Sequence, residues 1–228
     1  MGETALLIEH TSSDMAADNA AVIVLSRRLR RHIDYTQQRG IESITPAIQS
    51  VLIRFDPLLC SRSALDELVR QVALDDALSS KTSDELDDSV INAIRITVRY
   101  GGADGPDLSD VSQLTGLKPH EIIALHTAAP LRVLMMGFAP GFAYLGPLPD
   151  ALNVPRRSTP RVSVPAGSVA IAAGMTGIYP ARLPGGWHII GRASEILFDP
   201  QQQPPSRIVP GGWVQFVDGG QRAMSREL

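Results

Sequence analysis

The sequence predicts an α+β protein in which a small ferredoxin-like α/β domain, residues 1–88, precedes a closed or nearly closed β-barrel or sandwich, residues 89–228. Strand and helix patterns alternate along the first part, and a further strand is expected to close that unit. An acidic run at residues 84–88 is the expected linker. Beyond residue 137, short Val-, Ile- and aromatic-rich runs alternate with dense Gly and Pro, which is typical of short strands joined by tight corners.

The N-terminal domain is expected to begin with a strand at residues 5–9 and a helix from Asp18 to about Tyr35. The apolar side chains of this helix recur three and four residues apart and therefore share one face: Val22, Leu25, Leu29 and Ile33.

A second strand and helix follow in the N-terminal domain. The strand is expected at residues 51–55, and Asp56-Pro57 ends it. Ser61 is expected to cap a helix whose apolar face carries Leu65, Leu68, Val69 and Val72.

The C-terminal domain is expected to contain two short helices among many short strands. Gly101 to Pro106 form a tight turn, and Pro119 occupies the first turn of the second helix. The expected helices are residues 107–115 and 119–126, and the expected strands are 91–100, 131–138, 161–164, 168–172, 187–190, 196–198 and 213–217.

Composition excludes several classes of protein. The 228 residues include 44% hydrophobic and 20% charged side chains, which are values of a globular chain and not of a disordered one. The formal net charge of −3 argues against a general nucleic-acid binder. A single cysteine, Cys60, cannot form an internal disulfide. Without an apolar run long enough to span a bilayer or a secretory leader pattern, we expect a cytoplasmic protein with no membrane partner.

Standard catalytic and cofactor motifs are absent from the sequence. It has no phosphate loop, no dinucleotide fingerprint, no nucleophile elbow, and no lysine in a biotin-carrier setting, so no biotin is attached to this chain. The five histidines show no paired metal spacing, and no metal site is expected. The catalytic residues stay unknown, with His188, His126 and Tyr179 as candidates. A lone histidine is more often structural, but His188 could serve as a general base, because the side chain of histidine as a residue type titrates near neutral pH.

Positive charge is concentrated in the Gly- and Pro-rich segment. Between Ile122 and Ser194 there are six arginines and one acid, Asp150, in a chain whose net charge is negative. Arginine forks and bare turn amides are how proteins hold a carboxylate or a phosphate, so one interpretation is a site for a small anionic molecule. The alternative is that these arginines pair with acids of the N-terminal domain or of a partner.

Four stretches supply the candidate site residues. Aromatic residues, Gly and Pro of the first would form the pocket wall: Phe138, Pro140, Gly141, Phe142 and Tyr144. The others would supply substrate- or anion-binding groups: Arg156, Arg157, Arg161, Ser168, Thr176, Tyr179, Trp187 and Arg192. The alternatives for these stretches are a packed barrel corner or plain surface.

The same stretches resemble a known family. The matching strings are GFAPGFAYLG (137–146), PRRSTPR (155–161), VPAGSVAIA (164–172), TGIYPARLPGGWHIIGR (176–192) and LFDP (197–200). They resemble the PxpB/KipI family, also called allophanate hydrolase subunit 1 and carboxyltransferase domain, subdomain C and D. Weaker agreement extends the resemblance over nearly the whole chain.

The resemblance implies a small α/β domain followed by a cyclophilin-like β-barrel. It also implies a subunit of a heteromeric, ATP-dependent 5-oxoprolinase, which opens 5-oxo-L-proline to L-glutamate with PxpC/KipA-like and PxpA-like partners. ATP would then belong to the complex, and this chain would be inactive alone. Two alternatives remain open: a carboxyltransferase subunit of the urea or allophanate type that uses biotin on another chain, and an inhibitor of a histidine kinase.

Several positions depart from the family pattern, including Leu131 and the turn at residues 210–213. Met175, Leu183 and Ala193 stand where Gln, Ser and Thr are usual in the family. The first two remove polar groups beside the expected pocket, so a related protein with another substrate is a further alternative.

Overall fold

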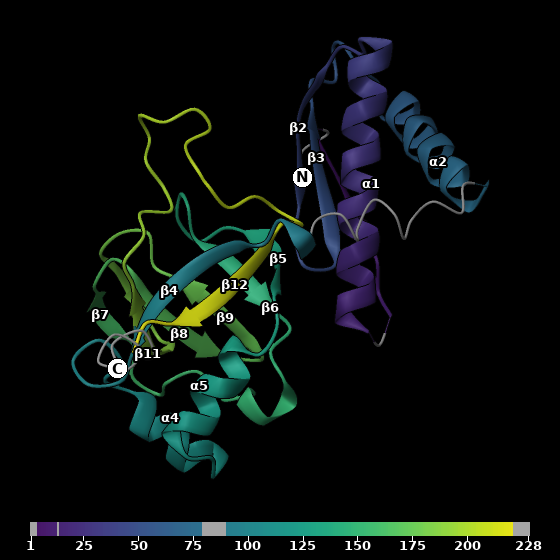
Figure 1. The fold of residues 1–228 in the computed structure, drawn as a ribbon. Coiled ribbons are helices and arrows are strands. Elements are labelled where there is room, and N and C mark those ends of the chain that lie inside the picture. Colours follow the sequence, from purple (N-terminus) through teal and green to yellow (C-terminus); the bar gives the residue numbers. More distant parts are fainter. Residues whose placement is uncertain (1–3, 13, 79–89, 221–228) are drawn as a thin grey trace. The chain divides into compact units, whose positions relative to one another are not determined.

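The computed structural model describes residues 4–12, 14–78 and 90–220. The chain divides into two compact units, residues 1–91 and 92–228, and each is described by itself (Figure 1). The predicted boundary after residue 88 and the acidic run at 84–88 lie outside the described residues. None of the described helices is both long and apolar enough to cross a bilayer.

The N-terminal unit is a three-stranded antiparallel sheet packed against helix α1. In chain order it contains β1 (Ala5–Glu9), α1 (Met15–Thr36), β2 (Ile41–Pro46), β3 (Ser50–Phe55) and α2 (Arg62–Leu78). The strand order is β1-β3-β2, and both pairs are antiparallel. The predicted helix faces are confirmed, because Val22, Leu29 and Leu65 are buried with Ile53 and Phe55 of β3.

Capping residues set the helix ends in this unit. Asp14 accepts hydrogen bonds from the backbone N–H groups of Ala16 and Ala17, so α1 begins before the expected Asp18. The predicted cap of α2 is confirmed, since Ser61 Oγ accepts from the Ala64 N–H at 3.2 Å.

The expected closing strand of this unit is not found among the described residues. The next strand, β4 (Ile94–Tyr100), pairs within the second unit instead. The reason is its pattern of side chains, because Ile96 and Val98 are fully buried in the core of the barrel. Within the described ranges, the N-terminal sheet therefore has the ferredoxin-like order without a fourth strand.

The C-terminal unit is a closed seven-stranded barrel with the strand order β11-β4-β12-β5-β6-β9-β8. Only the β4–β12 pair is parallel among the described strand pairs. β7 and β10 form a separate two-stranded ribbon. The remaining elements are α4 (Leu108–Thr115), α5 (Pro119–Thr127), β5 (Leu131–Met136), β6 (Ala143–Gly146), a 3₁₀ turn at Asp150–Leu152, β7 (Arg161–Val164), β8 (Ser168–Ala172), β9 (Met175–Ile178), β10 (Leu183–Gly185), β11 (His188–Ala193) and β12 (Trp213–Asp218).

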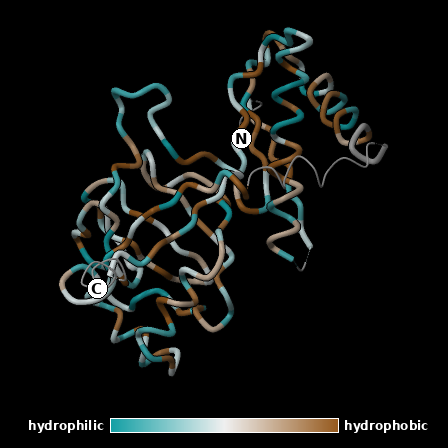
Figure 2. Tube along the Cα trace, viewed as in Figure 1, coloured by the Kyte–Doolittle hydropathy of each residue, from teal (hydrophilic) through white to brown (hydrophobic). Residues whose placement is uncertain are grey.

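Figure 2 shows that hydrophobic residues follow the barrel strands, and that the outer part of the long excursion between β11 and β12 is hydrophilic. A strand expected at 196–198 in this excursion is reduced to a single bridge between Phe198 and Ser206. The physical reason is the run of prolines nearby, Pro200, Pro204 and Pro205, which lack the N–H group that a strand ladder requires.

Candidate functional site

Five aromatic residues from four segments of the barrel come together in one cluster, which we call the aromatic face: Phe138, Phe142, Tyr144, Tyr179 and Trp187. The Phe142 ring is its centre. Its centroid lies 5.4 Å from that of Phe138, 5.0 Å from Tyr144, 5.3 Å from Tyr179 and 5.9 Å from Trp187, all edge to face. Such pairs contribute about 0.5–1.5 kcal/mol each beyond their buried area. The structure thus brings these candidate residues together.

The aromatic face has a buried base and an exposed edge. Phe142, Tyr179 and Trp187 are buried, and Tyr144 is half-buried. Phe138 is 57% exposed at the edge. Two of the positions that depart from the family pattern, Met175 and Leu183, also pack against this cluster, so apolar groups stand where polar ones were expected.

Glycines allow the rings to pack this closely. A Cβ atom at Gly185 would overlap the Tyr179 hydroxyl, and one at Gly177 would lie 2.9 Å from Cζ of Phe142. These two glycines lie on β10 and β9 and belong to the glycine-rich segment of the sequence. Their lack of a side chain makes room for the rings of the aromatic face.

The turn between β5 and β6 presents Phe138. It is closed by a hydrogen bond from the Gly137 N–H to the Phe142 carbonyl at 3.2 Å and contains Pro140. Phe138 has a φ of +67°, a conformation that is uncommon for a residue other than Gly. Gly141 has a φ of +80°, and a Cβ atom there would overlap Phe198.

Arg156 is the cation beside the aromatic face. Burial raises the pKa of the Tyr144 and Tyr179 hydroxyls, and the charge of Arg156 opposes that rise at both. Both hydroxyls feel the charge of Arg156, and because their pKa values are raised they stay protonated and can donate hydrogen bonds. The Arg156 side chain is exposed and forms no ion pair with any residue that the structure describes. This arrangement offers a cation and two hydroxyl donors next to apolar rings.

The backbone that carries Arg156 is tied to the start of β11. His188 Nε2 donates to the Pro155 carbonyl at 3.0 Å, and the Arg157 N–H donates to the Gly186 carbonyl at 2.8 Å. His188 is 5% exposed, and its Nδ1 has no hydrogen-bond partner in the described part of the chain. The candidate base is therefore a buried group that holds the Arg156 segment in place.

Arg157 and Arg161 converge on a buried carboxylate, Asp107, at the start of α4. Asp107 is 2% exposed and accepts from Arg157 Nη1 at 2.9 Å, from Arg161 Nη1 at 2.7 Å and Nη2 at 2.6 Å, and from the Ile189 N–H at 2.7 Å. Burial by itself would raise the pKa of Asp107, but these hydrogen bonds and the two positive charges outweigh it and hold that pKa below its usual value. Asp107 thus stays ionised.

Arg192 is also paired with an acid of the barrel. Its Nε lies 3.0 Å from Asp104, which also accepts from Arg99 Nε at 2.8 Å. Arg157, Arg161 and Arg192 are therefore paired with acidic side chains, which was the alternative to an anion-binding role. Their acidic partners lie in the turn after β4 and not in another domain. The sequence interpretation missed Asp104 and Asp107 because the charge count began after them.

Two further candidates, His126 and Thr176, meet inside the barrel. The Thr176 hydroxyl donates to the Ala170 carbonyl at 3.1 Å and so accepts from His126 Nε2–H at 2.9 Å. The Tyr100 hydroxyl consequently donates to His126 Nδ1 at 2.7 Å. All donors and acceptors of the imidazole are satisfied. Burial lowers the pKa of His126 to about 3, so it is neutral at physiological pH.

These buried groups do not reach the aromatic face. His126 is 1% exposed, and Thr176 and Ser168 are fully buried. Within the described ranges, no three His, Cys, Asp or Glu side chains come close enough together to hold a metal ion.

Replacing His126 by leucine should destabilise the barrel by about 2 kcal/mol, because Tyr100 and Thr176 lose buried hydrogen-bond partners. His126 binds protons less readily in the folded state, so its contribution to stability is full above its ordinary pKa of 6.5 and is lost as the pH falls towards 3. Chemical unfolding between pH 7 and pH 4 measures this. His120→Leu, an exposed change on the same helix, is the control and should keep the wild-type pH slope. An unchanged slope in His126→Leu would contradict the assignment.

The sequence matches a known family along most of its length. Residues 1–208 match the family described as carboxyltransferase domain, subdomain C and D. The chain is 37% identical over 217 residues to the B subunit of 5-oxoprolinase from Escherichia coli O157:H7, an alignment that covers 95% of this chain and 93% of that protein. It is 48% identical over 124 residues to the corresponding 5-oxoprolinase chain of Bacillus subtilis, covering 54% and 52% of the two chains.

Solved structures share the fold. The crystal structure of TTHA0988 matches with a TM-score of 0.78 and 29% identity over 95% of this chain, which corresponds to 40% of that longer chain. Urea carboxylase of Kluyveromyces lactis matches with a TM-score of 0.68 over 98% of this chain and 22% of its own. At 15% identity the second likeness concerns the fold alone.

Proposed function

The chain belongs to the carboxyltransferase subdomain C and D family, and from this premise we propose that it is the B-type subunit of a heteromeric 5-oxoprolinase. The complex opens 5-oxo-L-proline to L-glutamate with PxpC/KipA-like and PxpA-like subunits and uses ATP. The observation that carries the proposal is the 37% identity to the E. coli 5-oxoprolinase B subunit along 95% of this chain. ATP is assigned to the complex as a whole, because this sequence has no phosphate loop.

The aromatic face suits this substrate. 5-Oxoproline is a small, nearly flat lactam ring that carries one carboxylate. We infer that the ring lies against the aromatic edges and that Arg156 binds the carboxylate through charge-assisted hydrogen bonds. The neutral hydroxyls of Tyr144 and Tyr179 would donate to the lactam carbonyl. This chain would therefore bind and orient the substrate.

Residues of another subunit would complete the chemistry. The described side chains at the aromatic face do not include a nucleophile hydrogen-bonded to a base, the arrangement that covalent catalysis requires. The buried His188 supports the backbone at Pro155 and faces no such nucleophile. We accordingly expect the isolated chain to be inactive.

Co-expression with PxpC/KipA-like and PxpA-like subunits tests the proposal. The expected result is a stable complex that forms glutamate from 5-oxoproline only when ATP and this chain are present. A stable complex without turnover would reject the substrate, and urea with a biotin-bearing chain would be assayed next. Failure to form any complex would reject the subunit role.

Phe138→Gly separates substrate contact from stability. Glycine accepts the φ of +67° without strain, which offsets the lost contact with Phe142, so the unfolding free energy should change by less than about 1 kcal/mol. The KM for 5-oxoproline should rise about tenfold, because the exposed wall of the site is removed. Thermal melting and steady-state kinetics measure the two effects.

Ala173→Gly is the matched control for this variant. Ala173 has a φ of +51° in the turn between β8 and β9, outside the aromatic face. Its replacement should leave the KM unchanged. A KM that rose equally in both variants would show that backbone freedom, and not the phenyl ring, determines binding.

A further inference from the structure

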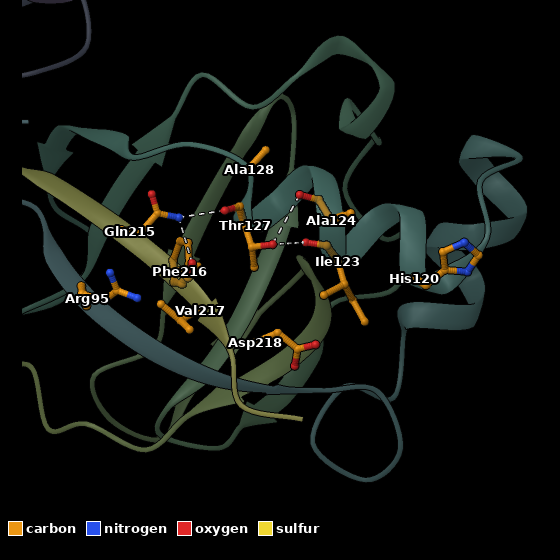
Figure 3. A pocket seen from close by; sticks show the side chains of 10 residues that line it. All are labelled: Arg95, His120, Ile123, Ala124, Thr127, Ala128, Gln215, Phe216, Val217 and Asp218. Carbon is orange, nitrogen blue, oxygen red and sulfur yellow. Dashed lines mark hydrogen bonds between the residues drawn. The ribbon is translucent and has the colours of Figure 1, made fainter. Parts of the chain in front are cut away.

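The two units end their sheets differently. The seven strands of the barrel form a closed ring, so each of them has a neighbour on both sides. Strand β12 is in addition joined to helix α5, because Gln215 Nε2 donates to the Thr127 carbonyl at 2.8 Å (Figure 3). The N-terminal sheet is open and ends in two edge strands, β1 and β2. An open edge attracts further strands unless the protein protects it.

The edge of β2 is protected in two ways. The Ala47 N–H donates to the Ser50 carbonyl at 2.7 Å, and bonded and unbonded residues alternate along β2 from there. The backbone groups of Ile44 and Pro46 therefore point away from β3. Arg30 of α1 donates to the Ile44 carbonyl and so occupies it. Pro46 has no N–H group that an added strand could bond.

The edge of β1 lacks this protection. The His10 N–H donates to the Gln49 carbonyl at 2.8 Å, and the same alternation runs back along β1. Ala5, Leu7 and Glu9 therefore point their N–H and C=O groups away from β3. No described strand pairs with these groups. Proline and lysine, which commonly guard an edge, are absent from the strand.

Exposed leucines accompany this free edge. Leu7 is 53% exposed and lies opposite Leu52 of β3, which is 37% exposed. Their neighbours Leu6 and Ile53 are buried with the helices, so the two leucines lie on the face of the sheet that the helices leave uncovered. Unpaired backbone groups beside exposed apolar side chains favour the addition of another strand.

We propose that β1 pairs with β1 of a second copy of this chain, antiparallel and centred on Leu7. In this register Leu7 bonds to Leu7 of the second copy, and Ala5 bonds to its Glu9, so all the outward backbone groups find partners. Leu6 lies opposite Ile8 of the second copy. The strand is thus self-complementary, because no two charged side chains lie directly opposite each other.

The edges that remain favour a second copy over a different protein. Pairing through β1 gives one continuous sheet with the order β2-β3-β1-β1-β3-β2. Both outer edges are then β2 strands, which Arg30 and Pro46 protect. A strand added from an unrelated chain would bring its own unprotected outer edge. Twofold pairing therefore covers the free edge without creating another.

Sedimentation of the isolated chain tests the proposal. We expect a reversible dimer with a micromolar dissociation constant, because the interface is small. Leu7→Lys should raise this constant at least about a hundredfold, because two ammonium groups would then face each other at the centre of the ladder. Thr45→Lys is the matched control, since Thr45 is also exposed and lies opposite Leu52 on its other side. It should dimerise like the wild type, and melting curves verify that both variants are folded.

Engineered cysteines test the register. Bonded residues opposite each other in an antiparallel pair have Cα atoms about 5.5 Å apart, which a disulfide can bridge. Under mild oxidation Leu7→Cys should form a covalent dimer, and a mixture of Ala5→Cys and Glu9→Cys should form mainly the mixed dimer. Thr45→Cys should stay uncrosslinked. The natural Cys60 is buried and does not take part.

Three results would overturn the inference. The first is a chain that sediments as a monomer up to millimolar concentration. The second is a dimer that Leu7→Lys leaves intact, and the third is a dimer in which Leu7→Cys does not cross-link. None of them bears on the proposed oxoprolinase function, because these experiments need no partner subunit and no 5-oxoproline.

Discussion

Asp107→Asn should destabilise the barrel by about 3 kcal/mol, the largest loss of stability that we expect from a single isosteric change. The carboxylate is almost fully buried and accepts four hydrogen bonds, three of them from Arg157 and Arg161. Removing its charge leaves two guanidinium groups crowded together without their partner. Urea unfolding at pH 7 measures the difference.

Asp110→Asn is the control for this variant. Asp110 lies on the same helix and contacts the same Arg157 at 3.4 Å, but its side chain is 52% exposed. Its removal should cost less than about 0.5 kcal/mol. Equal losses in the two variants would contradict a special role for the buried carboxylate.

Low pH should destabilise the barrel in the same way as Asp107→Asn, because it protonates the Asp107 carboxylate that Arg157 and Arg161 contact. The pKa of Asp107 is lower in the folded than in the unfolded chain, so its contribution is present above the ordinary value of 3.8 and is lost as the pH falls through the folded value. The loss due to His126 starts at higher pH, near 6.5. Unfolding curves of Asp107→Asn should therefore differ from the wild type least in strong acid.

Arg156→Gln should lower kcat/KM for 5-oxoproline by about a hundredfold in the assembled complex, mainly through KM. A charge-assisted hydrogen bond to the substrate carboxylate contributes about 1.5–3 kcal/mol. The uncharged analogue 5-oxoprolinamide provides the cleanest measurement. Wild type and variant should process this amide at similar rates, because it has no carboxylate for Arg156 to bind.

Arg182→Gln is the matched control for Arg156. Arg182 is an exposed arginine of the same barrel whose guanidinium donates to Ser163. Its loss should leave kcat/KM unchanged. A hundredfold loss with both 5-oxoproline and its amide in Arg156→Gln would indicate a damaged fold, and melting curves would show it.

Local sequence patterns predicted most of the helices and strands of the fold. The spacing of Val22, Leu25, Leu29 and Ile33 predicted α1, and Ser61 marked the start of α2. Strands β6, β9 and β10 were not predicted, because each has only three or four residues and contains Gly. Their conformation depends on pairing with neighbours in the barrel, which no local pattern records.

The candidate site was predicted in part. The aromatic residues stood out because they alternate with Gly and Pro. The environment of the arginines could not be predicted, because Asp107 lies 50 and 54 residues before Arg157 and Arg161. Counting charges along the sequence finds six arginines but does not show which of them are paired. In the fold, Arg156 is the one predicted anion-binding arginine without an acidic partner among the described residues.

The position of β12 has a consequence for how the barrel is made. This strand lies between β4 and β5, so residues 213–218 insert between the first two strands of the barrel. While the chain is being synthesised, β4 and β5 both present unpaired edges until residue 218 has left the ribosome. Exposed edges invite pairing with other chains, and contacts so distant in sequence form slowly. Loss of β12 would therefore leave both edges open and make the chain prone to aggregate during synthesis.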